Sequence, residues 1–106
     1  MVYARLPWIG FVVALSMTGA TAKAETIQVT IDKLVFSPRI LNAKVGDTIE
    51  WINKDILDHT ATVKGGWDVL IPAGKSASLI LDGDQSVEYY CRFHPNMRGR
   101  VTVTTP

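Results

Sequence analysis

Hydrophobic and polar residues alternate along most of the chain after residue 25, as expected for half-buried β-strands. Ile27, Val29 and Ile31 give the first example, with polar residues between them. Further extended segments, separated by turn-forming residues, lie at 34–36, 40–41, 48–53, 59–63, 67–71, 76–81, 87–91 and 100–104. No stretch of ten residues carries a helical stripe. The pattern predicts an all-β fold, an antiparallel Greek-key β-sandwich of seven to eight strands. Its core is expected to hold three large aromatic residues, Trp51, Trp67 and Tyr89.

The first 24 residues have a different pattern. Arg5 precedes an uncharged, largely apolar run over residues 6–22, and Ala22-Lys23-Ala24 has small residues at the two positions that signal peptidase reads. This layout predicts a secretory signal peptide over residues 1–24, cleaved after Ala24, and a single domain over residues 25–106. An uncleaved membrane anchor is the alternative, because the run approaches spanning length. Glycine and hydroxyl residues within it favour the signal peptide. We therefore expect a periplasmic protein without a stable membrane span after cleavage.

The charge balance gives no reason to expect nucleic acid as a partner. The chain has 11 Lys and Arg against 10 Asp and Glu. Two of the basic residues, Arg5 and Lys23, lie in the predicted leader, which leaves nine bases against ten acids in the domain. No basic run is longer than one residue, so a cationic tract of the kind that binds phosphates is absent from the sequence.

Cys91 is the only cysteine, so it cannot form an internal disulfide. In an oxidising compartment such a thiol must be buried, paired with another chain or bound to metal. Cys91 begins a Cys-x-x-His-x-x-Met run that continues to His94 and Met97, and His59 is the only other histidine. Two imidazoles, a thiolate and a weakly held thioether are the ligands of blue copper sites. The sequence predicts one copper ion bound by His59, Cys91, His94 and Met97.

Each of these residues has an ordinary explanation when it is taken alone, as core filler or as a surface side chain. Their joint order and spacing favour a metal site. Zinc fits less well because it seldom takes a thioether. A catalytic Cys91–His94 pair would lack an orienting third residue and an oxyanion site, so no enzyme is predicted. The Asp82-Gly83-Asp84 segment lacks the other ligands of a calcium loop and is interpreted as a turn.

The chain resembles the cupredoxins, the small blue copper proteins, and most of all their amicyanin-like members. The resemblance rests on Trp51-Ile52-Asn53, on His59, on the Pro72-Ala73-Gly74 turn and on residues 89–103 with their short ligand loop. It implies a monomeric one-electron carrier whose copper cycles between Cu(I) and Cu(II). It also implies weak, transient docking of redox proteins, a dehydrogenase or a c-type cytochrome, near a partly exposed His94.

Three positions depart from the amicyanin-like pattern. Thr60 replaces an Asn that ties two loops together and bonds near the thiolate, so the hydroxyl would have to take over that role. Asp58 replaces a Pro and adds an acid next to His59, and Asn96 replaces a large apolar residue. These changes keep a second function open, copper binding for delivery or sequestration. A third is a copper-free interaction domain.

Arginines surround the ligand loop, at positions 92, 98 and 100. They are either a solvated surface or a device that steers an acidic partner toward the loop. The sequence leaves both readings open.

Overall fold

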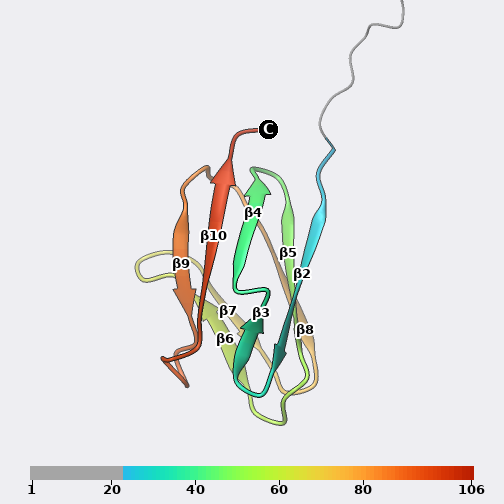
Figure 1. The fold of residues 1–106 in the computed structure, drawn as a ribbon, viewed down its shortest axis with the longest axis vertical. Coiled ribbons are helices and arrows are strands. Elements are labelled where there is room, and N and C mark those ends of the chain that lie inside the picture. The colour runs from blue at the N-terminus through green and yellow to red at the C-terminus, as the bar shows by residue number, and fades with distance from the viewer. Residues whose placement is uncertain (1–22) are drawn as a thin grey trace, which may run out of the picture.

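The computed structural model describes residues 23–106, which form nine β-strands and no helix (Figure 1). In chain order the strands are β2 (Thr26–Asp32), β3 (Val35–Ser37), β4 (Ile40–Lys44), β5 (Thr48–Asn53), β6 (His59–Thr62), β7 (Asp68–Ile71), β8 (Ser76–Ile80), β9 (Val87–Tyr90) and β10 (Arg98–Thr104). They build two sheets, ordered β4-β10-β9-β6-β7 and β3-β2-β5-β8. The predicted β-sandwich is confirmed.

The signal peptide stays a prediction, because residues 1–22 lie outside the described residues. Between residues 23 and 106 the structure contains no helix with the length and hydropathy needed to cross a bilayer.

Two details of the sandwich differ from the sequence-based expectation. Both sheets are mixed, because β2 pairs with β5 in parallel and β10 pairs with β4 in parallel. The chain passes from β3 in one sheet to β4 in the other and then returns to the first sheet at β5. This crossover lets β5 run beside β2 in the same direction. The described part also has nine strands rather than seven or eight, since the short segments β3 and β4 are separate strands in different sheets.

The core is built around a group of aromatic rings that pack against one another. Tyr89, on β9, lies with its ring centroid 4.8 Å from Phe36, 5.6 Å from Trp51 and 5.7 Å from Trp67. The Phe36 and Trp51 contacts are edge-to-face, the arrangement that aromatic quadrupoles favour. Trp51 and Tyr89 are buried, and Trp67 is half-buried at the margin of the core. Burial raises the pKa of Tyr89 to about 12, so its hydroxyl stays neutral at ordinary pH.

A buried carboxylate fastens the end of the sandwich that carries the C-terminus (Figure 1). Asp47, in the turn between β4 and β5, accepts hydrogen bonds from the backbone N–H groups of Glu25 and Lys44, both at 2.9 Å. These two hydrogen bonds, the Glu25 bond first, lower the pKa of Asp47 below its ordinary value. Asp47 thereby joins the chain segment that enters β2 to the β4–β5 turn.

Replacing Gly99 by Ala is expected to destabilise the fold strongly. Gly99 on β10 lies opposite Tyr89, and a Cβ at this position would overlap the phenol ring. The ring cannot move aside because Phe36 and Trp51 pack against it. We expect urea denaturation to show a loss of about 1–3 kcal/mol or more in unfolding free energy. Gly83→Ala, where a Cβ meets open space, is the control; equal losses in both variants would contradict this account.

Asp47 is expected to make stability depend on acid pH. Because its pKa is lower in the folded than in the unfolded chain, its contribution is present above the unfolded value of 3.8. It is lost as the pH falls through the folded value, since the unfolded chain then takes up the proton more readily. Urea midpoints of the wild type and Asp47→Asn should therefore converge between about pH 5 and about pH 2. Asp82→Asn, at an exposed acid, should stay parallel to the wild type; a constant gap for Asp47→Asn would contradict the assignment.

Candidate metal centre

Two neighbouring strands bring His59 and Cys91 to the same end of one sheet. His59 is the first residue of β6, and Cys91 directly follows Tyr90, the last residue of β9. The strands are antiparallel, with Thr62 at the end of β6 opposite Tyr90 at the end of β9, so the start of β6 lies beside the residues that follow β9. This end is opposite the end that carries the C-terminus (Figure 1). Strand pairing therefore positions both residues.

A tight loop between β9 and β10 carries the other two predicted ligands. The N–H of Met97 donates to the carbonyl of His94 at 2.9 Å, and the N–H of Cys91 donates to the carbonyl of Met97 at 3.1 Å. These bonds fold the loop back on itself. Met97 is buried at the end of this loop, and His94 is half-buried.

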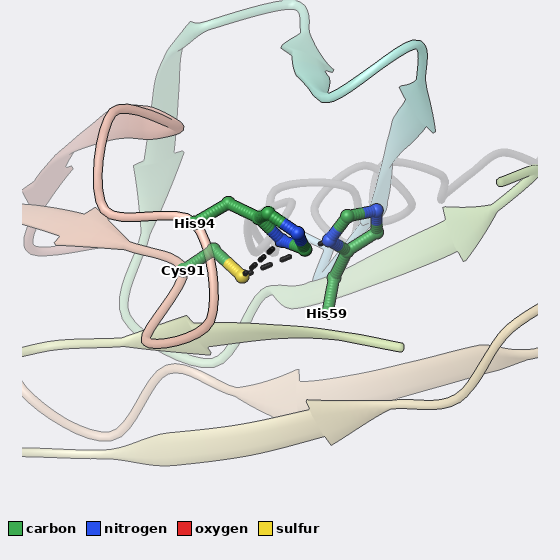
Figure 2. Close-up of side chains that lie close together, drawn as sticks. All are labelled: His59, Cys91 and His94. Carbon is green, nitrogen blue, oxygen red and sulfur yellow. Dashed lines mark hydrogen bonds between the residues drawn. The ribbon is translucent and has the colours of Figure 1, made fainter. Parts of the chain in front are cut away.

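The Cys91 sulfur faces one nitrogen of each histidine (Figure 2). It lies 3.7 Å from Nδ1 of His59 and 3.9 Å from Nδ1 of His94, and all three atoms lie within 4.8 Å of one another. A metal bound at about 2.0 Å to nitrogen and about 2.3 Å to sulfur, with angles of about 120°, separates the two donors by roughly 3.7 Å. Both sulfur–nitrogen distances are thus close to those that a trigonal ion requires. A soft sulfur with two imidazoles is a set that copper favours.

The other nitrogen of the His59 ring is held by an acid. Nε2 lies 2.8 Å from Oδ2 of Asp55, whose carboxylate also accepts the backbone N–H groups of Lys33 and Leu34 at 2.7 and 3.0 Å. Burial by itself raises the pKa of Asp55, but the bonds from Leu34, His59 and Lys33 outweigh it and lower the pKa. An ionised carboxylate only accepts, so Nε2 carries the ring proton. The lone pair of Nδ1 is then directed at the Cys91 side of the ring.

Sequence reasoning missed Asp55 and drew attention to Asp58 instead. Asp58 instead accepts the N–H of Ala73 at 2.9 Å. The missed signal is the buried Asn53. Its side-chain oxygen accepts the backbone N–H of Asp55 at 2.9 Å, and its side-chain amide nitrogen donates to the backbone carbonyl of Leu57 at 2.9 Å. Asn53 thus folds the loop before β6 so that Asp55, and not Asp58, meets His59.

Thr60 does connect the two ligand-bearing segments. Its backbone N–H donates to the Cys91 sulfur at 3.4 Å, and its hydroxyl oxygen accepts the N–H of Arg92 at 2.9 Å. The shorter side chain therefore makes the link that the sequence comparison left in question. It does so with the residue that follows Cys91.

Exposed apolar side chains lie on the loops that meet at this end of the sandwich. We call them the apolar rim: Leu34, Val35, Ile56, Leu57 and Phe93. Ile56 is 93% exposed. Of the surrounding arginines, Arg92 pairs with Asp68 at 3.0 Å and Arg100 with Glu88 at 3.6 Å. The charges of Arg92 and Arg100 are therefore partly neutralised within the chain.

Comparison with known proteins agrees with the fold. The chain matches the family model of the cupredoxin-like domain over residues 6–103. It is 32% identical to amicyanin from Paracoccus denitrificans over 87 residues, which cover 73% of this chain and 64% of that protein. It therefore spans less than two thirds of the length of that relative. Amicyanin-alpha from Methylorubrum extorquens is 27% identical over 89 residues, covering 77% of this chain and 75% of that protein.

Solved structures show the same likeness. A reduced amicyanin point mutant superposes with a TM-score of 0.67 at 32% identity, covering 74% of this chain and 81% of its own. The Cu(I) form of another amicyanin mutant gives a TM-score of 0.69 at 29% identity, with the same two coverages of 74% and 81%.

Replacing Asp55 by Asn is expected to weaken metal binding. The amide no longer requires a proton on Nε2 of His59, so the ring can place its proton on Nδ1, the atom that faces Cys91. Loss of such a supporting carboxylate lowers metal affinity by about tenfold to a hundredfold. Chelator competition for Cu(II) measures the change. Asp58→Asn removes the same charge without touching His59 and should keep wild-type affinity; equal weakening in both would indicate a charge effect only.

Proposed function

The chain belongs to the cupredoxin-like domain family, and from this we propose that it is a periplasmic blue copper protein that carries single electrons between redox partners. It catalyses no reaction of its own. His59, Cys91, His94 and Met97 are the proposed ligands. The observation that carries the proposal is the meeting of one sulfur with two imidazole nitrogens, at 3.7 and 3.9 Å, with all three atoms within 4.8 Å of one another. The predicted leader over residues 1–24 supports the location.

The surrounding residues suit electron transfer because they hold the donors still. Bound copper supplies the one-electron Cu(I)/Cu(II) couple. The Asp55 carboxylate fixes the His59 ring, and the Thr60 N–H fixes the Cys91 sulfur. His59, Cys91 and Thr60 are each fully buried. Donors that stay in place when the charge changes keep the reorganisation small, and a small reorganisation lowers the barrier to transfer.

The route for electrons leads through His94. It is the half-buried member of the three, whereas His59 and Cys91 are fully buried. The apolar rim offers a partner a water-excluding contact around this residue, with few charges to hold it. Redox complexes of this kind are small and short-lived. We propose that a dehydrogenase or a c-type cytochrome docks here, transiently, on a monomer.

A Cys91→Ser variant is expected to lose the intense blue absorption that arises from thiolate-to-copper charge transfer. The measurement is a visible spectrum during titration of the metal-free protein with Cu(II). Serine keeps nearly the same volume but provides a hydroxyl, which is no soft donor. Far-ultraviolet circular dichroism of both proteins controls for folding. Survival of the band in the serine variant would remove Cys91 from the ligand set.

The same copper-loaded protein separates a carrier from a protein that delivers or stores copper. A carrier is reduced by a c-type cytochrome at an encounter-controlled rate, on the order of 10⁵–10⁷ M⁻¹s⁻¹. Tight copper binding with much slower reduction, and with slow electron self-exchange, would reject the carrier and support delivery or sequestration.

A further inference from the structure

Four residues that are not proposed ligands form a closed ring of hydrogen bonds beside the centre, through their side chains and one backbone N–H group. The backbone N–H of Arg92 donates to Oγ1 of Thr60 at 2.9 Å, and Oγ1 of Thr60 lies 2.9 Å from Oγ1 of Thr62. The Thr62 hydroxyl donates to Oδ1 of Asp68 at 2.6 Å. The Nε–H of Arg92 donates to the same oxygen at 3.0 Å and closes the ring.

The direction of every bond in the ring is determined by Asp68. The Thr62 hydroxyl first, and the Arg92 guanidinium next, lower the pKa of this carboxyl, so it is ionised and can only accept. Thr62 therefore gives its hydrogen to Asp68 and accepts one from Thr60. Thr60 in turn accepts the backbone N–H of Arg92. Each hydroxyl thus has one donor and one acceptor, and its orientation is fixed.

The ring begins at the protein surface and reaches Thr60, whose backbone N–H contacts the Cys91 sulfur. Asp68 and Arg92 are partly exposed, whereas Thr60 and Thr62 are buried. Thr60 follows His59 in the chain and Arg92 follows Cys91, so the ring clamps the two segments that carry these ligands. The Thr60 N–H, held by this clamp, donates to the Cys91 sulfur at 3.4 Å.

We propose that the Thr60–Thr62–Asp68–Arg92 ring is a positioning device that presses the Thr60 N–H against the Cys91 sulfur and so raises the reduction potential of the centre. The inference rests on the proposed function. A hydrogen bond to the thiolate stabilises the sulfur most when the site holds the extra electron, so it favours the reduced state. Hydrogen bonding around this sulfur is a known lever on the potential of such sites.

Thr62→Val tests the ring without any change of charge. Valine has the same shape but no hydroxyl, so both the link to Thr60 and the link to Asp68 are lost. We expect a lower reduction potential and a shift of the thiolate-to-copper band to longer wavelength, because the sulfur becomes the better electron donor. Thr62→Ser keeps the hydroxyl and should return both readouts to wild-type values. Wild-type readouts in Thr62→Val would overturn the proposal.

Asp68→Ala and Arg92→Ala separate positioning from simple electrostatics. The first removes a negative charge and the second removes a positive one, so a purely Coulombic effect would move the potential in opposite directions. If the ring positions Thr60, breaking it lowers the reduction potential of the centre in both variants. Opposite shifts overturn the proposal, and equal downward shifts support it. Both residues are partly exposed, so these variants also serve if Thr62→Val folds poorly.

The metal-free protein provides a readout that does not depend on copper. Amide hydrogen exchange at Thr60 should become about tenfold faster in Thr62→Val, which corresponds to about 1.4 kcal/mol for a lost hydrogen bond. Unchanged exchange overturns the proposal even if the potential moves. If the wild type binds no copper with a blue band, the proposed function fails, and the exchange measurement still decides whether the ring positions Thr60.

Discussion

The antiparallel pairing of β6 with β9 places the start of β6 beside the loop that follows β9, and the candidate centre depends on that register. With Thr62 opposite Tyr90, His59 and Cys91 come together from positions 32 residues apart. A slip of one residue would turn every β6 side chain to the opposite face of the sheet. The aromatic core helps to fix the position of β9 in this pairing, because Tyr89 on β9 is packed among three rings.

Buried polar groups, rather than apolar packing, shape the end of the sandwich around the centre. Asn53, His59 and Thr60 are almost wholly buried, and each finds hydrogen-bond partners there. Leaving such a group unpaired costs about 1–3 kcal/mol, so each of them admits very few loop conformations. The hydrogen bonds of these buried groups therefore fix the positions of the donor side chains. The apolar residues of the same loops are not needed for this and can face outward.

The fold class and the proximity of Cys91 and His94 could be predicted from sequence because both rest on local signals. Alternation of period two identifies strands, and the spacing from Cys91 to Met97 lies within one loop. The supporting residues could not be predicted, since they depend on how separate loops meet. Asp55 and Asp58 look equivalent in the sequence, and only the hydrogen bonds of Asn53 decide which reaches His59. The parallel strand pairs were missed as well, because the alternation of apolar and polar residues does not encode strand direction.

Full burial of the Cys91 sulfur has a bearing on how the protein matures. Thiol–disulfide exchange needs direct access to the attacking sulfur, so an enclosed thiol is sheltered from oxidants and from the thiols of other molecules. Once the chain has folded, Cys91 is therefore expected to resist mixed-disulfide formation and to keep its sulfur available as a donor.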